Sequence, residues 1–373
     1  MILFLHNRYR IQGGEERAVS DLAWLVREHL GEPVELLERD SLGLGTATAA
    51  RGLLRGGVEP EEVGEAVRRT GARIVHAHNL NPSFGPRALA AARGAGARIV
   101  LHLHNYRLVC AVGTCVNSRG EDCIRCRGRD TRPGVRLNCR GSRPEAAVYA
   151  AALARHSATL TAHADAVIVP SRAALARLQE LRAPLGDTPV HVVGHVVRAL
   201  KGAPPPAPPL DGFALAVARL APEKAVDAAI DACALARVPL VIAGDGPERA
   251  RLEASARGHD VRFVGRVDTA ALARLRGEAS VAVVTTRAHE TFGLAALEAM
   301  AAGLPTVATA RGALEELAGG AELVAPEDRE GLAGAIARVR GDAAAGRRAH
   351  AAALRLAAPA VIAPQLAAAY AGG

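Results

Sequence analysis

Short apolar runs alternate with helical patterns from one end of the chain to the other, and this alternation constrains the fold more than any other feature. The apolar runs stop after about seven residues, a length that suits buried parallel strands. Strands alternating with helices are typical of parallel α/β architecture. The predicted strands are 1–6, 34–37, 73–78, 98–104, 166–170, 190–193, 213–218, 240–243, 261–264, 281–285, 306–308 and 322–324.

A proline-rich segment divides these strands into two sets. Residues 201–210 read KGAPPPAPPL, and five prolines in ten residues exclude a helix or a central strand. At 373 residues the chain is long enough for two domains. We therefore predict a doubly wound domain over 1–200, a semi-rigid linker over 201–211 and a second doubly wound domain over 212–341. The alanine-rich end, 342–373, is predicted to be a helical tail that packs back across the hinge.

Ligands of doubly wound sheets bind at the carboxyl ends of the strands, so a cleft between two such domains is the expected site. Half of the residues are apolar and only 3% are aromatic, so the core must consist of Ala, Val and Leu. No run approaches the length of a bilayer span, and the start of the chain does not read as a signal peptide. We therefore expect a cytoplasmic protein, with a peripheral position at the inner face of the membrane as the alternative.

The positive charge of the chain is uneven. The first 200 residues hold 27 arginines against 19 acidic residues, which accounts for the whole net charge of +8. The arginines concentrate between Arg119 and Arg143. An anionic acceptor or an anionic membrane surface could use such a segment, and a solvated loop is the alternative. Nucleic acid is not expected as a partner, because the segment lacks interleaved aromatic residues for base stacking.

The most informative segment is 281–316, VAVVTTRAHETFGLAALEAMAAGLPTVATARGALEE. A buried strand leads into a short polar loop, and Gly293 opens a helix whose first amides form a ready anion site. Glu290 lies at the tip of the loop, and Glu298 follows eight residues later within the helix. One carboxylate can face sugar hydroxyls while the other faces a ribose diol. Each of these residues alone would be an ordinary loop or helix residue. Their occurrence in this order after a predicted strand makes them informative about a binding site.

This order of features resembles the large GT-B family of retaining glycosyltransferases often called family 4, whose fold consists of two Rossmann-like domains. The E-x7-E element of that family corresponds to Glu290-TFGLAAL-Glu298, and EAMAAGLPTVAT follows it. The resemblance implies that Glu290 holds the hydroxyls of the donor sugar and Glu298 the ribose. It also implies that the amides of Phe292, Gly293 and Leu294 approach the diphosphate.

A second element, VARLAPEK at 217–224, resembles the G-R-L-x-x-x-K-G element of the same family. Arg219 and Lys224 would then neutralise the diphosphate leaving group without a metal ion. Lys224 is one of only two lysines in an arginine-rich chain, which favours a specific need for an ammonium group. A lysine at the surface that caps a helix is the structural alternative. Val264 begins a segment similar to the edge where family members bind the base.

The first predicted strand leads into a glycine pair, Gly13-Gly14, before a helix. Such a turn presents backbone amides to a phosphate or an acceptor. By the resemblance, this is the GGxE-type loop near the donor phosphates. Glu15 and Glu16 are interpreted as acidic residues at a helix start.

The fourth predicted strand ends in His104-Asn105-Tyr106, which resembles the H-D-Y/F element of the family. The resemblance implies that His104 reaches the donor sugar near its O6 side. Asn105 replaces the usual Asp and so removes a possible charge partner of the histidine. We interpret His102 as structural, because it points to the same face deeper in the sheet. His78 could line the acceptor pocket, although a core or surface role is the more common one for a single histidine.

Five of the six cysteines fall in one arginine-rich loop, 107–144. Cys123-x2-Cys126 has the spacing of metal ligands, and the other cysteines of the loop could complete a tetrahedral zinc site. Structural zinc, reduced thiols and disulfides remain open; a cytosolic compartment disfavours disulfides. A related subgroup of the family carries a similar cysteine pattern, and the long loop is expected to be a mobile acceptor-binding element. The cysteines concerned are Cys110, Cys115, Cys123, Cys126 and Cys139.

We therefore expect a retaining, metal-independent transfer of a sugar from a nucleotide diphosphate sugar to an acceptor hydroxyl. His104, Arg219, Lys224 and Glu290 are the expected catalytic residues. A UDP-sugar is the first expectation for the donor and a GDP-sugar the second. The acceptor could be a glycan, a lipid-linked sugar or a small natural product. The alternatives are a pseudo-glycosyl or sugar-phosphate synthase on the same fold, a catalytically silent nucleotide-binding protein, and a membrane-surface binding protein.

Overall fold

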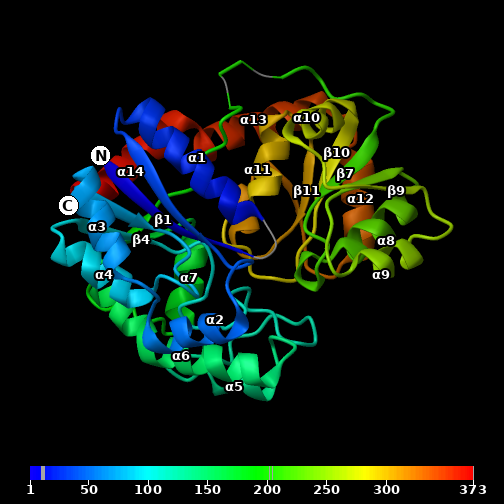
Figure 1. The fold of residues 1–373 in the computed structure, drawn as a ribbon. Helices are drawn as coiled ribbons and strands as arrows, with labels where there is room; N and C mark the ends of the chain where they lie inside the picture. The colour runs from blue at the N-terminus through cyan, green and yellow to red at the C-terminus, as the bar shows by residue number, and fades with distance from the viewer. Residues whose placement is uncertain (10–12, 201, 204, 373) are drawn as a thin grey trace. The chain divides into compact units, whose positions relative to one another are not determined.

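The computed structural model describes residues 1–9, 13–200, 202–203 and 205–372. The chain divides into two compact units, each an α/β structure around a six-stranded sheet. Unit 1 comprises Met1–Val196 and the end of the chain from Ile362, and unit 2 comprises Val197–Val361. The prediction of two doubly wound domains is confirmed, because all strand pairs between the named strands are parallel (Figure 1).

The sheet of unit 1 has the strand order β2-β1-β3-β4-β5-β6. Its strands are β1 (Ile2–Arg8), β2 (Val34–Asp40), β3 (Ile74–Ala77), β4 (Arg98–His102), β5 (Ala166–Val169) and β6 (Val190–Val192). Its helices are α1 (Gly14–His29), α2 (Thr46–Arg55), α3 (Glu61–Thr70), α4 (Gly85–Gly94), α5 (Arg132–Arg136), α6 (Arg143–Ala162) and α7 (Arg172–Glu180). One face of the sheet forms a core with α3, α4, α6 and α7, which explains the unbroken apolar runs of the central strands.

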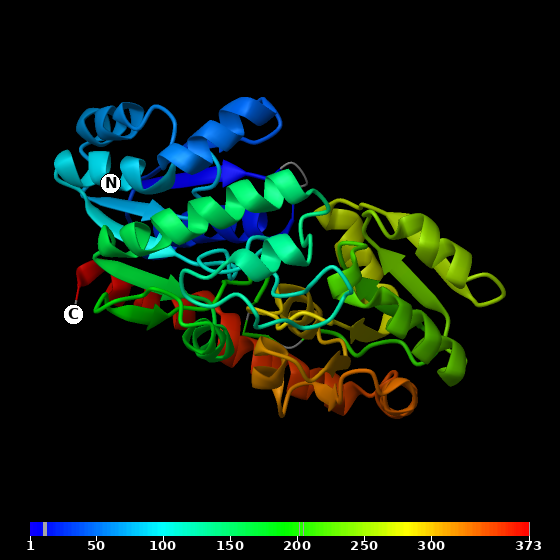
Figure 2. The same cartoon turned by 90° about the horizontal axis from the view of Figure 1, so that it is seen from below.

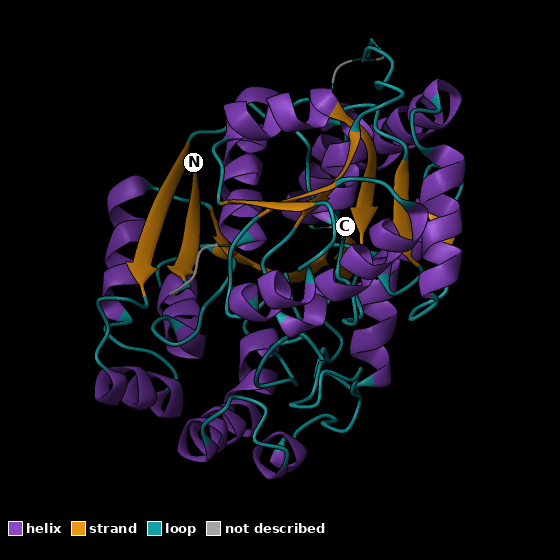
Figure 3. Cartoon of the chain, turned by 90° about the vertical axis from the view of Figure 1, so that its right-hand side faces the viewer, coloured by secondary structure: helices purple, strands orange, loops and turns teal. Residues whose placement is uncertain are grey.

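The sheet of unit 2 has the order β12-β11-β10-β7-β8-β9. Its strands are β7 (Phe213–Val217), β8 (Leu240–Ala243), β9 (Val261–Gly265), β10 (Ala279–Val284), β11 (Thr306–Thr309) and β12 (Glu322–Val324). Its helices are η1 (Pro222–Lys224), α8 (Val226–Ala236), α9 (Arg249–Ser255), α10 (Thr269–Glu278), α11 (Leu294–Ala301), η2 (Ala313–Leu317), α12 (Arg329–Val339) and α13 (Ala343–Ala357). Helices flank the strands of each unit (Figure 3).

Each of the twelve predicted strands overlaps one strand of the structure. The loop 107–144 differs from its prediction as a segment without regular structure. It contains the short helix α5, and Val116 pairs with Asp122 in an isolated antiparallel bridge. The segment lies in the cyan-to-green part of the chain before α6 (Figure 2). Local turns and a proline at the start of α5 therefore give this loop a defined path.

The end of the chain corrects the expectation that no run approaches the length of a bilayer span. The segment Ala343–Ala371 is long and apolar enough to cross a membrane, with a mean hydropathy of 1.4 in its most apolar window. In the structure it consists of two helices, α13 and α14 (Pro359–Ala371), with Ala358 in an extended conformation between them. Buried alanines of α13 pack in a core of unit 2, and Tyr370 of α14 is buried in unit 1. Packing accounts for part of the apolar character of this segment, because 39% of that window is buried, and a single segment of this kind is weak evidence for a membrane role.

Candidate functional site

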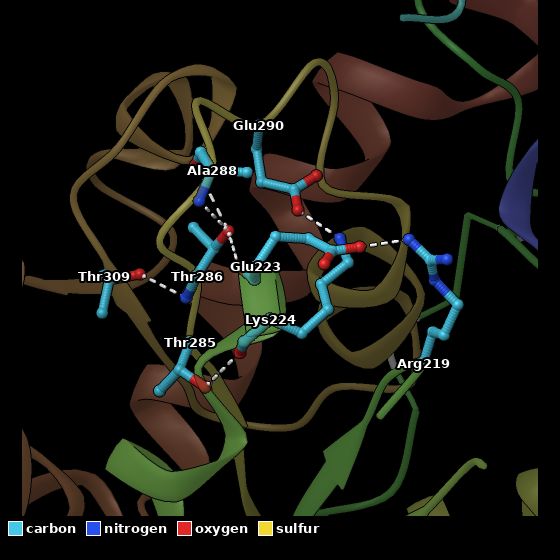
Figure 4. A network of polar contacts seen from close by, with 8 residues as sticks. All are labelled: Arg219, Glu223, Lys224, Thr285, Thr286, Ala288, Glu290 and Thr309. Carbon is cyan, nitrogen blue, oxygen red and sulfur yellow. Dashed lines mark hydrogen bonds and ion pairs between the residues drawn. The ribbon is translucent and has the colours of Figure 1, made fainter. Parts of the chain in front are cut away.

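Two ion pairs lie at the carboxyl end of β7. The Lys224 ammonium is paired with the Glu290 carboxylate, and the Arg219 guanidinium is paired with Glu223 (Figure 4). The side chain of Glu290 is 15% exposed and that of Lys224 is 30% exposed, so both remain reachable from one side. The structure therefore brings together Lys224 and Glu290, which are 66 residues apart in the sequence.

Hydrogen bonds from the end of β10 fix the backbone of η1. The Thr285 hydroxyl donates to the carbonyl of Lys224 at 2.9 Å, and the Thr286 hydroxyl donates to the carbonyl of Glu223 at 3.0 Å. The Thr286 amide in turn donates to the Thr309 hydroxyl at 3.0 Å, which ties β11 to the same point. These threonines connect the ends of β10 and β11 to η1, so the sheet sets the position of the lysine backbone.

The loop that carries Glu290 is held by its backbone. Glu290 pairs with Gly312 in a parallel bridge, and the Ala313 amide donates to the Glu290 carbonyl at 2.9 Å. Gly312 has φ +64°, and a Cβ at this position would lie 2.5 Å from the Glu290 carbonyl oxygen. Close approach of the two backbones therefore requires glycine here.

Gly293 is the N-cap of α11 and has φ +86°. Leu294 is the first residue of the helix and Phe292 is buried, so the three residues expected at the diphosphate form one helix entry. A Cβ at Gly293 would lie 2.6 Å from the Leu314 side chain. The helix entry is thus closely packed, and its first backbone amides have no acceptor within the helix. Such amides can donate hydrogen bonds to an anion.

Glu298 lies on α11 and pairs with Arg276 of α10 at 2.5 Å. Their side chains are 10% and 12% exposed, so this is a largely buried ion pair. Sequence reasoning did not find Arg276, since nothing in the spacing of the two residues indicates contact. Val264 lies on β9 and is half-buried, next to Gly265, whose carbonyl accepts a hydrogen bond from the Gly244 amide at 2.8 Å. Glu298 and Val264 belong to unit 2, as do Lys224 and Glu290.

Histidines form a buried layer on one face of the sheet in unit 1. The register of the strands pairs Phe4 with His76 and His76 with Val100, so His78 and His102 continue the same face. His76 Nε2 lies 3.2 Å from His102 Nδ1, and His76 Nδ1 lies 2.8 Å from the Tyr370 hydroxyl. The interpretation of His102 as structural agrees with this arrangement.

His104 belongs to the same layer. Its Nε2 lies 2.9 Å from His78 Nδ1, and its ring stacks on His102 and His195 with centroids 4.1 and 5.1 Å away. Burial lowers the pKa of His104 well below its usual range, and the charges of neighbouring histidines lower it further. At neutral pH, His104 is therefore a neutral imidazole that can donate or accept one hydrogen bond.

Nitrogens of this layer meet the spacing of metal ligands in two overlapping groups, each with its atoms within 4.8 Å of one another. Hydrogen bonds join His76 Nε2 with His102 Nδ1 and His78 Nδ1 with His104 Nε2. The ring planes are nearly parallel, with interplanar angles of 11° for His76 and His102 and 9° for His102 and His104. No described carboxylate belongs to either group. Burial lowers the pKa of these histidines, so their rings are neutral at neutral pH.

A polar network follows His104 in the sequence. Asn105 Nδ2 donates to Glu15 at 3.2 Å, and the Tyr9 hydroxyl donates to the same carboxylate oxygen at 2.8 Å. Burial raises the pKa of Glu15 to about 7, although the nearby Arg107 lowers it. Sequence reasoning took Glu15 as an acidic residue of a helix start and missed this network. Asn105 is thus hydrogen-bonded to a carboxyl group from α1.

The glycine pair lies at the start of α1. Gly13 is the N-cap, and its amide donates to the Glu16 side chain at 2.7 Å in a capping box. Gly13 and Gly14 are both exposed, and residues 10–12 of this turn lie outside the described part. Glu16 has the helix-start role expected from the sequence. An exposed helix entry of this kind can receive an anionic group.

All six cysteines carry free thiols. The five of the loop surround one small cavity between the loop and α5. The sequence alone left structural zinc, reduced thiols and disulfides open for these cysteines. Their common position around one cavity depends on the path of the loop, which the sequence does not show.

Known proteins resemble parts of this chain. Residues 213–342 match the family model described as glycosyl transferases group 1. A GDP-mannose-dependent alpha-(1-6)-phosphatidylinositol dimannoside mannosyltransferase of Mycobacterium tuberculosis is 47% identical over 105 residues, which cover 26% of this chain and 27% of that protein. A glycogen synthase of the same species is 43% identical over 155 residues, covering 38% and 37%. The matches therefore span well under two thirds of these relatives.

Solved structures resemble the whole chain at low identity. Sucrose-phosphate synthase from Thermosynechococcus elongatus has a TM-score of 0.71 at 20% identity and covers 99% of this chain and 98% of its own. Anabaena HepE, solved with UDP and glucose, has a TM-score of 0.63 at 21% identity and covers 98% of both chains. Likeness at this identity shows a shared fold. The chain therefore has the GT-B fold of two parallel-sheet Rossmann-like units, and its residues 213–342 are similar to the glycosyl transferases group 1.

Proposed function

We propose that this protein transfers a sugar from a nucleotide diphosphate sugar to an acceptor hydroxyl, with retention of configuration and without a catalytic metal. The Lys224–Glu290 pair, whose lysine is held by hydrogen bonds from the end of β10, is the observation that carries the proposal. Lys224 and Arg219 stabilise the negative charge that develops on the diphosphate as the glycosidic bond breaks. The entry of α11 at Gly293 supplies backbone amides to the same group.

Glu290 is proposed to position the sugar hydroxyls rather than to attack the anomeric carbon. Its carboxylate is already paired with Lys224, and such a pair lowers the nucleophilicity of the oxygen that it occupies. A donor phosphate oxygen would then take the proton of the acceptor hydroxyl. Glu298 would hold the ribose and Val264 the base, and His104, as a neutral imidazole, would reach the sugar.

The relatives suggest which donors to test first. The sequence alone placed UDP-sugars before GDP-sugars, whereas a relative with 47% local identity is named for GDP-mannose and HepE was solved with UDP. We propose GDP-mannose as the first candidate and UDP-glucose as the second. A thermal-shift screen separates them, because a ligand at 100 times its dissociation constant adds about 2.7 kcal/mol to the stability.

Transfer itself is tested with the preferred donor and a panel of acceptors, and NMR of the product gives the anomeric configuration. An α-linked product from an α-linked donor, formed in the presence of EDTA, supports the proposal. Inversion contradicts retention, and loss of activity in EDTA that Mg²⁺ or Mn²⁺ restores contradicts metal independence. Binding of a nucleotide without transfer to any acceptor or to water would favour the catalytically silent alternative.

An anionic acceptor is proposed from the charge of the loop 107–144. Seven of its arginines are exposed, and among the described carboxylates only Asp130 forms an ion pair with one of them, Arg132. A phosphate-bearing acceptor would gain from such a surface. We place the reaction in the cytoplasm, where the free thiols of the chain persist. Any metal in the protein is proposed to be structural and bound by the cysteine loop.

A further inference from the structure

Arg276 and Glu298 form a largely buried ion pair inside unit 2. Arg276 lies near the end of α10, and Glu298 lies in the middle of α11. The Arg276 Nη2 donates to the Glu298 Oε2 at 2.5 Å, and the two side chains are 12% and 10% exposed. Charge-assisted hydrogen bonds of this kind are among the stronger ones in proteins. The bond therefore fixes one oxygen of a carboxylate that the proposed function assigns to the donor ribose.

The surroundings of this pair are apolar. Ala299, which follows Glu298, is buried in one hydrophobic cluster of unit 2, and Leu275, which precedes Arg276, packs against that cluster. Val264, the residue expected at the base of the nucleotide, packs against the same cluster. The ion pair and the expected base contact are thus connected through one packed group of side chains.

An ion pair in such surroundings is a poor means of stabilising the fold. Removal of two charges from water carries a penalty that their attraction often fails to offset, and apolar side chains of similar volume can stabilise a core as well. The Arg276 Nε adds to the penalty, because it is buried and has no hydrogen-bond partner among the described residues. A role in the site therefore explains the presence of the pair better than a role in the core.

The chemistry of the pair suits a sugar diol. An ionised carboxylate only accepts hydrogen bonds, and its two oxygens offer about four lone-pair positions. The bond from Arg276 uses one of these positions, and ribose hydroxyls are donors that can use others. A glutamate side chain without such a bond would lose conformational entropy when it binds the hydroxyls. Arg276 reduces this loss, because it holds the carboxylate before the nucleotide arrives.

We propose that Arg276 is a positioning residue of the donor site, which holds Glu298 in place for the ribose and so makes the protein select ribonucleotides over deoxyribonucleotides. This inference rests on the proposed function, in which Glu298 binds the ribose. Arg276 acts through Glu298 and does not contact the donor itself. The interaction is the same in the ground state and the transition state, so its loss should raise the donor KM and leave kcat almost unchanged.

The first experiment measures nucleotide binding to the full chain by isothermal titration calorimetry. The probes are GDP and UDP, and each is compared with its 2′-deoxy and 3′-deoxy forms. We expect the wild type to bind the preferred ribonucleotide about tenfold more tightly than a deoxy form, since the missing hydroxyl leaves a buried carboxylate unpaired. Arg276→Met should weaken binding of the ribonucleotide about tenfold and leave the deoxy form nearly unaffected, which brings the ratio of the two affinities close to one.

Three further variants test how Arg276 acts. Arg274→Met is the matched control, because Arg274 lies on the same helix with an exposed side chain and should keep the wild-type ratio. Arg276→Lys keeps a positive charge beside Glu298 and should give an intermediate ratio, because an ammonium lacks the planar fork of a guanidinium. It also serves as the test if Arg276→Met does not fold. Arg276→Met added to Glu298→Gln should bind as Glu298→Gln does alone, because the arginine acts through the carboxylate.

The possible outcomes separate this inference from the proposed function. A merely structural role would lower the melting temperature of the Arg276 variants and leave the affinity ratio unchanged in every variant that folds, which overturns the inference. A further loss of binding on adding Arg276→Met to Glu298→Gln would mean direct contact with the nucleotide and would refute the positioning role. Equal binding of the ribonucleotide and both deoxy forms by an active wild type would refute the inference and leave sugar transfer intact. Failure of the wild type to bind GDP or UDP would instead refute the proposed function.

Discussion

Glu290 and Gly312 lie side by side as a parallel bridge, and the amide that follows Gly312 donates to the Glu290 carbonyl at 2.9 Å. The glycine lets the two backbones approach so closely that no side chain fits between them. The position of the acidic side chain in the site therefore depends on a residue that carries no chemistry of its own.

Gly312→Ala is expected to destabilise the protein by about 2 kcal/mol or more, because it combines a left-handed conformation with a backbone clash. Displacement of Glu290 should also lower transfer more than the loss of folded protein explains. Denaturant unfolding and steady-state kinetics of the folded fraction measure the two effects.

Gly319→Ala is the matched control for this change. Gly319 also has a positive φ, +82°, but a Cβ there meets no atom within 4 Å. It should cost about 1 kcal/mol and leave kcat unchanged. Equal effects of the two substitutions would mean that contact with Glu290 is unimportant.

Lys224→Ala is expected to lower kcat by a factor of about 10² to 10³, because it removes a fixed positive charge from the developing diphosphate. The donor KM should change much less than kcat if the charge acts mainly in the transition state. Lys224→Arg tests the need for a compact ammonium, and a nearly complete rescue would argue against that need.

Lys201→Ala is the control, since Lys201 is the other lysine of the chain and lies in the proline-rich segment. It should retain full activity. If Lys224→Ala raised only the donor KM, the lysine would contribute to binding alone.

His78 is expected to orient His104 through the 2.9 Å contact between their ring nitrogens. His78→Gln keeps a polar group at this position, and His78→Leu removes it. We expect His78→Leu to lower kcat by about fivefold and His78→Gln to recover part of the loss, with little change in the donor KM, since loss of one hydrogen bond costs about 1 kcal/mol.

The steady-state kinetics of wild type, His78→Leu and His78→Gln are measured from pH 5.5 to 8.5, and the thermal unfolding of the three proteins is measured in parallel. A merely structural role would lower the melting temperature of both variants and leave kcat of the folded enzyme intact. That outcome would remove His78 from the site.

The local sequence pattern was sufficient to predict the strands and to recognise the donor-side motif. It was insufficient to predict contacts between residues that are far apart in the sequence. The apolar residues of runs such as 98–104 predict a buried strand. Glu290 and Lys224 could be recognised because each lies in a short sequence motif. The pairing of Glu298 with Arg276, and of Asn105 with Glu15, depends on how separate elements pack. The sequence contains no periodic signal for such contacts.

The histidine layer illustrates the same limit. A histidine in an apolar strand is compatible with a ligand, a catalytic group or a core residue, and only the register shows that His76, His78 and His102 share one face. The cysteine loop shows it again, since only the path of the loop shows that its five cysteines line one cavity.

The histidine layer should make the protein sensitive to acid. Burial lowers the pKa of His76 to about 3 and that of His195 to about 4. Both values lie below the unfolded value of about 6.5, so the unfolded chain binds protons that the folded chain does not. The stabilising effect of these neutral rings is complete above about pH 6.5 and declines as the pH falls toward 4. Each such histidine should remove up to about 1.4 kcal/mol of unfolding free energy per pH unit within this window.

Urea unfolding at pH 7.5, 6.5 and 5.5 gives the free energy of unfolding at each pH. The slope of this free energy with pH, rather than its absolute value, is compared between variants. His76→Gln should flatten the slope between pH 6.5 and 5.5, because it removes one group that only the unfolded chain protonates. His259→Gln is the control, since His259 is exposed and should leave the slope unchanged. An identical slope in wild type and His76→Gln would mean that this ring is protonated in the folded protein, and the buried layer would then have to accommodate a positive charge next to Tyr370.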